Sequence, residues 1–332
     1  MKALLLPLAA AAAAAFVAPR TAPAQPAPPV APTAAVGSFL RAEDHRIVAI
    51  VHRLGVAGRE HCPATLPLTG LAFHHLAEYR PRDRPEAIAR YGLDRGIGLL
   101  SVVEGSPAAQ ALLQAGDVLV SVNGVAFPAP QAIAAEEQEN ERRRQMSASE
   151  EMLEEALRLG AAEVRVARGG QIRTVRLASV PGCPARGRLA RSGQDNAFAD
   201  GRYVIMTTGF LGFFRSDDEL AVALAHELAH NILRHPQQLE AQGVPRGMMR
   251  HIGRNARLVR ATEVEADQLS VRLLASAGYD LDAILPFWRR LHGRADSALQ
   301  IISAHPGLKA RERYIGAAIA EVRAGAVPAP AR

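Results

Sequence analysis

The sequence contains little lysine and few aromatic residues, and these shortages argue against a nucleic-acid-binding protein. Only Lys2 and Lys309 are lysines, so the net charge of +6 comes from arginines that are spread among acidic residues. Aromatic residues make up 5% of the chain, and no segment alternates them with basic side chains. The one dense basic run, at residues 142–144, follows several glutamates and indicates a solvated helix face. We therefore expect no nucleic-acid partner.

Long apolar runs are lacking everywhere except at the N-terminus. An apolar segment at residues 3–18 follows Lys2 and precedes Ala22-Pro23-Ala24, which is the layout of a secretory signal peptide. No later stretch reaches the roughly 18 apolar residues that span a bilayer. No cysteine stands at the expected cleavage site, which argues against a lipid anchor there. We expect a periplasmic or secreted protein with at most peripheral membrane contact. The alternative is an N-terminal anchor in the inner membrane, with the protein facing the periplasm.

Cysteine is also scarce. Cys62 and Cys183 are the two in the chain, and in an oxidising compartment they are expected to form a disulfide. Buried free thiols are the alternative. Metal ligation is not expected, because His61 is the only Cys or His neighbour at chelating spacing.

The segment His226-Glu227-Leu228-Ala229-His230 carries the chemistry of the chain. Positions four apart share one face of a helix, so His226 and His230 present two imidazoles to the same point. Glu227 lies one step round the helix, where its carboxylate reaches a metal-held water without taking a coordination position. We therefore predict Glu227 as the general base.

The local sequence predicts a helix around this motif. Ser216 and Glu219 form the pattern of a capping box at its start, and Pro236 marks its end. The competing interpretation is a pair of surface histidines on an alanine-rich amphipathic helix.

A hydrolytic zinc site needs a third protein ligand and keeps one open position. No third histidine follows six residues after His230, but a second amphipathic helix is predicted from Thr262 to Ala277. Glu263 and Asp267 share one of its faces, so Glu263 can ligate zinc while Asp267 accepts the outer N–H of a ligand histidine. Glu265 is the competing ligand, but it lies on a different face from Asp267. We predict one Zn²⁺ per chain.

These motifs together resemble family forty-eight of the metallopeptidases, a gluzincin family that includes the CAAX prenyl proteases and bacterial quality-control proteases. The resemblance runs from about residue 188 to 320, and its later parts are Gly278-Tyr279-Asp280, His305-Pro306 and Arg311. It implies a zincin-type fold and a regulatory or transition-state role for His305 or Arg311. A loop cap at His305 and a structural anchor at Arg311 are the alternatives. A prenylated substrate is not implied, because transmembrane segments are missing.

Residues 91–180 resemble PDZ domains of the kind attached to bacterial periplasmic proteases. The resemblance places Gly96, Ile97, Gly98 and Leu99 in the loop whose backbone amides hold a peptide C-terminus. A tight turn without a ligand is the alternative. Because Cys62 and Cys183 lie on either side, we expect this domain to be inserted into the peptidase domain, with the disulfide closing its base.

The expected fold class is α+β, with a mainly helical zincin-type domain, a small β-sheet, and a barrel-like PDZ domain with flanking helices. The expected boundaries are a signal peptide at 1–24, a Pro/Ala-rich leader at 25–37, an N-terminal helix and strand at 38–90, the PDZ domain at 91–180, the peptidase domain at 181–325 and a tail at 326–332.

The sequence therefore predicts a zinc endopeptidase of the cell envelope that acts in protein quality control, with misfolded envelope polypeptides as substrates. A strand at residues 202–206 is expected to align the substrate by main-chain pairing. The alternative is a catalytically latent, chaperone-like protein that binds peptides without cutting them.

Overall fold

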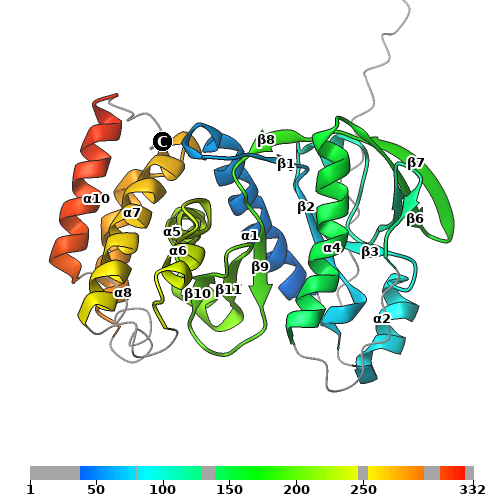
Figure 1. The fold of residues 1–332 in the computed structure, drawn as a ribbon, viewed down its shortest axis with the longest axis horizontal. Helices are drawn as coiled ribbons and strands as arrows, with labels where there is room; N and C mark the ends of the chain where they lie inside the picture. The colour runs from blue at the N-terminus through cyan, green and yellow to red at the C-terminus, as the bar shows by residue number, and fades with distance from the viewer. Residues whose placement is uncertain (1–37, 80, 129–138, 246–252, 295–306, 326–332) are drawn as a thin grey trace, which may run out of the picture. The chain divides into compact units, whose positions relative to one another are not determined.

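The computed structural model describes residues 38–79, 81–128, 139–245, 253–294 and 307–325 (Figure 1). The chain divides into two compact units, Met1–Ser38 and Phe39–Arg332, and everything below concerns the second. The predicted signal peptide, leader and tail lie outside the described residues, as does His305. Within the described ranges, no helix is both long and apolar enough to cross a membrane.

The first described helix and strands connect the two halves of the second unit. Helix α1 spans Ser38–Ala57 and buries Ile47, Val51 and Leu54 on one face. A short 3-10 helix, η1 (Arg59–His61), leads to β1 (Leu66–Leu68) and β2 (Leu71–His74). The single strand predicted here is broken because Gly70, at φ +78, turns the chain into a second sheet.

The PDZ-like part is an antiparallel sheet with strand order β2-β3-β4-β6-β7, and β5 pairs with β4. Residue 91 is therefore too late as its boundary, because β2 pairs with β3 and belongs to this sheet. The elements are η2 (Leu76–Glu78), η3 (Pro81–Asp83), α2 (Arg84–Tyr91), β3 (Ile97–Val102), α3 (Pro107–Gln110), β4 (Val118–Val122), β5 (Val125–Ala126), α4 (Glu139–Arg158), β6 (Ala162–Arg168) and β7 (Gln171–Leu177).

The disulfide lies where the chain enters and leaves this sheet. Cys62 and Cys183 are bonded, with their Cα atoms 5.6 Å apart. Between them, β1 pairs with β8 (Val180–Gly182) over three residues. The PDZ-like part is thus inserted between β1 and β8, and the disulfide closes its base as expected from the sequence.

The remaining elements form a small sheet and a group of helices around a separate core. The sheet has the order β10-β11-β9, in which β11 pairs with β10 antiparallel and with β9 parallel. The elements are β9 (Gly187–Ala190), β10 (Ala197–Ala199), β11 (Val204–Thr207), η4 (Thr208–Phe213), α5 (Asp217–Ile232), α6 (His235–Ala241), α7 (Gly253–Ser276), η6 (Leu281–Ala283), α8 (Ile284–His292) and α10 (Leu308–Arg323). The mixture of helices and sheets agrees with the predicted α+β class.

The central position of β11 corrects one prediction. Residues 202–206 were expected to pair with substrate, but both edges of β11 are already occupied. The terminal strand beside the motif helix is β10, which packs on α5. Among the strands that the structure describes, β10 is therefore the one beside the motif helix with an edge at which a substrate strand can pair.

Helix α5 is the centre of the helical core. It packs along α7, as Figure 1 shows, and Leu220, Leu224 and Leu228 on it are fully buried. A buried leucine contributes roughly 1.5–3 kcal/mol by leaving water. This packing fixes the motif helix in the core, with the turn that carries His226 and His230 facing α7.

Candidate metal centre

The start of α5 is capped in the way its sequence indicates, with one difference. Ser216 Oγ accepts a hydrogen bond of 3.3 Å from the Glu219 amide. The Glu219 carboxylate does not return to the Ser216 amide; it accepts from the Arg215 amide at 2.7 Å and pairs with Arg290. The predicted capping box is thus half formed, and its glutamate ties α5 to α8 instead.

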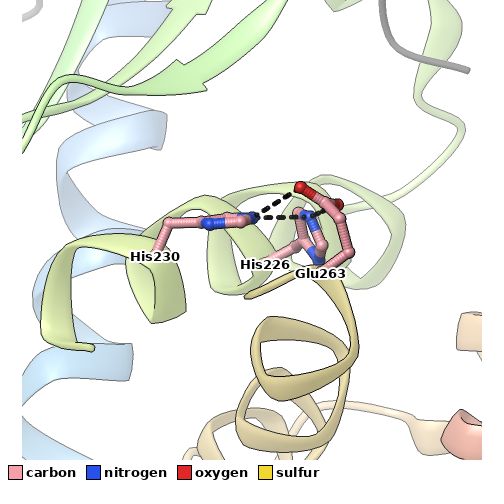
Figure 2. A group of neighbouring side chains, drawn as sticks. All are labelled: His226, His230 and Glu263. Atoms are coloured by element: carbon pink, nitrogen blue, oxygen red, sulfur yellow. Dashed lines mark hydrogen bonds and ion pairs between the residues drawn. The ribbon is translucent and has the colours of Figure 1, made fainter. Parts of the chain in front are cut away.

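Three side chains from two helices converge on one point. Figure 2 shows His226 and His230 on α5 facing Glu263 on α7. The two histidine Nε2 atoms lie 3.2 Å apart, and the Glu263 oxygens lie 3.3 Å from His226 Nε2 and 3.5 Å from His230 Nε2. All three ligand atoms lie within 4.8 Å of one another. The three side chains predicted as metal ligands therefore meet.

The surroundings of this point favour a cation. His226 is 1% exposed and Glu263 is 4% exposed. Burial lowers the pKa of His226, but the carboxylates of Asp267 and Glu263 outweigh it and raise this pKa to about 10. Two carboxylates at a buried site stabilise positive charge, whether a proton or a metal ion supplies it. Two imidazole nitrogens and one carboxylate are a donor set that suits zinc.

Asp267 and Arg311 hold the ligands from behind. Asp267 Oδ1 lies 3.1 Å from His226 Nδ1, and Asp267 Oδ2 accepts a hydrogen bond of 2.9 Å from Arg311 Nε. Arg311 Nη2 also lies 3.4 Å from Glu263 Oε2. The guanidinium is 5% exposed and stacks on Trp288, whose ring meets the His226 ring edge-on. Arg311 thus contacts both carboxylates of the site and the tryptophan beside it.

Glu227 is suited to proton transfer. Burial raises the pKa of its carboxyl to about 7, with His226 lowering it and Glu263 raising it further. A hydrogen bond from the Ala199 backbone amide also lowers this pKa. A carboxyl with a pKa near neutrality can take up and release a proton during one reaction cycle. The contact with Ala199 also places the edge strand β10 beside the predicted base.

His235 is a site residue that the sequence interpretation missed. It is 1% exposed, and its Nδ1 lies 2.9 Å from His230 Nδ1. Its Nε2 lies 3.1 Å from Glu265 Oε2. Arg234, at φ +56, adopts a left-handed conformation that ends α5 and starts α6. Helical periodicity does not extend through such a turn, so only the five-residue spacing from His230 was available as a signal.

Glu265 was the competing ligand. Its carboxylate contacts His235, which lies on the Nδ1 side of His230, away from the two Nε2 atoms. Glu265 Oε2 pairs with His235, whereas Glu263 contacts both Nε2 atoms. The preference for Glu263 agrees with this arrangement.

The structure places three of the four residues of the predicted carboxylate-binding loop in a strand. Gly96 lies immediately before β3, and Ile97, Gly98 and Leu99 are its first residues; β3 pairs with β4 through Ile97 and Gly98 and with β2 through Gly98 and Leu99. The Leu99 amide donates to Asp117 at 2.7 Å. A side chain at Gly96 would collide with the Leu119 carbonyl, and one at Gly98 with the His74 ring. These glycines allow close strand packing, and they do not form a nest of free amides.

A cavity of about 800 Å³ lies between the outer strand of the PDZ-like sheet and the small sheet. Its walls include Leu71–Phe73 of β2, the α4 residues Met146, Leu153 and Leu157, and Arg188, Phe198 and Tyr203 on the opposite side. Glu150 of α4 bridges the walls, because it accepts hydrogen bonds from Tyr203 Oη at 2.7 Å and Arg202 Nη2 at 2.9 Å. The cavity thus adjoins the hairpin that carries β10.

Comparisons with known proteins agree with both resemblances carried by the motifs. Residues 171–255 match the model of Peptidase family M48, and residues 99–136 match that of a PDZ domain. The chain is 29% identical over 149 residues to the mitochondrial metalloendopeptidase OMA1 of Schizosaccharomyces pombe, covering 38% of this chain and 44% of that protein. It is 28% identical over 136 residues to OMA1 of Arabidopsis thaliana, covering 35% of this chain and 27% of that protein. The alignments thus span less than half the length of either relative.

Proposed function

We propose that the chain is a zinc metalloendopeptidase. The observation that carries the proposal is the meeting of His226, His230 and Glu263 beside Glu227. The match to Peptidase family M48 and the names of the two relatives support it. The family match includes the two histidines and Glu227, and the structure adds Glu263 from beyond it.

The residues of the site have separate tasks in peptide hydrolysis. Zinc bound by His226, His230 and Glu263 supplies a Lewis acid that acidifies water and polarises a carbonyl. Glu227 accepts the proton of the attacking water on its carboxylate and returns it to the leaving amine. Asp267 and Arg311 keep the first ligands oriented, so the site needs little rearrangement.

The polypeptide substrate lies along β10. This strand is terminal in its sheet, and the Ala199 amide on it already reaches the Glu227 carboxylate. An extended chain that pairs antiparallel or parallel with β10 passes directly over the metal ligands. Main-chain pairing is independent of side chains, which suits a protease that acts on many sequences.

A second stretch of polypeptide binds in the cavity between β2 and α4. β2 is the terminal strand of the described sheet and lines the cavity, and the α4 wall combines the apolar Met146, Leu153 and Leu157 with Glu150 and Glu154. A peptide that pairs with β2 extends the sheet by main-chain hydrogen bonds and places alternate side chains against α4. This position replaces the loop at residues 96–99 as the peptide site of the PDZ-like part.

The protein acts in the cell envelope on misfolded polypeptides. The N-terminal layout of a charged residue, an apolar segment and small residues supports export. The disulfide supports an oxidising compartment.

Cleavage of casein tests the function directly. The wild-type protein should cut casein, lose activity with a chelator and regain it when zinc is restored. Glu227→Gln should bind zinc but not cleave, whereas Glu240→Gln, an exposed change on the next helix, should leave cleavage unchanged. An active Glu227→Gln protein would contradict the mechanism. A wild-type protein that binds casein and zinc but leaves casein intact would support the latent, chaperone-like alternative.

A further inference from the structure

His235 is a buried side chain to which the hydrolytic mechanism assigns no task. It follows the motif helix and lies at the first position of α6. Both nitrogens of its ring have a hydrogen-bonding partner. Its Nδ1 faces His230 Nδ1 at 2.9 Å, and its Nε2 faces Glu265 Oε2 at 3.1 Å. The Nε2 atom of His230 is on the opposite side of that ring, where it faces His226 and Glu263.

These contacts allow one arrangement of protons when His230 binds a metal. A neutral imidazole that offers Nε2 to a metal carries its proton on Nδ1. That N–H donates to His235, so Nδ1 of His235 must be the unprotonated acceptor. The proton of His235 is then on Nε2, from which it donates to the Glu265 carboxylate.

We infer that His235 is a positioning residue that fixes the tautomer and ring orientation of His230, with Glu265 in turn fixing His235. This inference rests on the proposed metal site and adds an assignment to it. His230 thereby has a support separate from that of His226, whose Nδ1 faces the Asp267 carboxylate. The two ligand histidines have different supports: a buried carboxylate behind His226 and an imidazole behind His230.

A merely packing role for His235 makes a different prediction. The rings of His230 and His235 meet edge-on with centroids 4.9 Å apart, so a phenylalanine at position 235 preserves the ring contact. It removes the acceptor and leaves a buried N–H of His230 without its partner. An asparagine loses the ring but keeps the acceptor, because its Oδ1 is attached to Cγ as Nδ1 is in histidine. A glutamine carries the same amide one carbon further out, where the acceptor misses His230.

The test is zinc affinity, measured by competition with a chromophoric chelator on purified full-length protein. His235→Phe and His235→Gln should bind zinc about 10–100-fold more weakly than wild type. His235→Asn should remain within about threefold of wild type. With Co²⁺ in place of zinc, the visible spectrum of His235→Asn should match wild type, and those of the other two variants should differ.

Two results would overturn the inference: wild-type affinity in His235→Phe, or equal weakening in His235→Asn and His235→Gln. Thermal unfolding of the chelator-treated proteins establishes that each variant is folded, and Gln and Asn keep the position polar if Phe prevents folding. The outcome is independent of proteolysis. If zinc affinity follows the expected order while casein stays intact, the positioning role stands and the proposed peptidase function fails.

Discussion

Removal of the disulfide should lower the free energy of unfolding, chiefly through its effect on the unfolded chain. The change is Cys62→Ala with Cys183→Ala, which opens a covalent loop with a sequence separation of 121 residues. In the chain-entropy model, closing a loop of that size lowers the entropy of the unfolded chain by an amount worth about 5 kcal/mol at 25 °C. The non-covalent closure at this place is short, because β1 and β8 pair over three residues. The disulfide therefore makes the larger contribution to holding the two ends of the inserted part together.

Urea denaturation followed by circular dichroism measures this effect. The double variant should have a free energy of unfolding about 3–5 kcal/mol lower than wild type, since engineered and natural bridges often give less than the entropy model. Cys62→Ala alone breaks the same bond, so the second substitution should add less than about 1 kcal/mol. Wild type under a reducing agent is the matched control. A double variant within about 1 kcal/mol of oxidised wild type would refute the reasoning.

Three further predictions concern buried charges. Asp267→Asn should weaken zinc binding about 10–100-fold, measured by chelator competition, because the carboxylate behind His226 is lost; unchanged affinity would contradict that role. Glu150→Gln should lower the free energy of unfolding by about 2–4 kcal/mol in urea, because the buried carboxylate is lost and the partly exposed Arg202 keeps only Glu151 as an ionic partner; a loss below about 0.5 kcal/mol would show that the bridge contributes little. Burial lowers the pKa of His75 from 6.5 to about 4, so below pH 6.5 the unfolded chain takes up a proton that the folded protein does not. Between pH 7 and about pH 4.5 wild type should therefore lose roughly 2–3 kcal/mol more stability than His75→Asn, which keeps an acceptor for the Ala77 amide; equal losses in urea would exclude His75 as the cause.

The metal site could be predicted closely because its parts obey local rules. The four-residue spacing of His226 and His230 fixes their common face as soon as the segment is helical. The same spacing linked Glu263 to Asp267 and separated both from Glu265. The cysteines were predicted to pair from their number and compartment, and they do.

The errors have a common physical origin in non-local pairing. The glycines near residue 97 have the composition of a binding loop, but in the sheet they relieve collisions with Leu119 and His74. The strand at residues 204–207 has the pattern of any buried strand, and nothing in that pattern indicates that both of its edges are paired.

The sequence by itself determined that two imidazoles and a carboxylate share one turn of a helix, because helix geometry depends only on spacing. Tertiary structure alone decided what stands behind each imidazole and which strand edge faces Glu227. Those features depend on the packing of α5 against α7, on the left-handed turn at Arg234 and on the strand order β10-β11-β9. Each feature depends on a contact between segments that are far apart in the chain or separated by a turn. No periodic pattern in the sequence therefore indicates it.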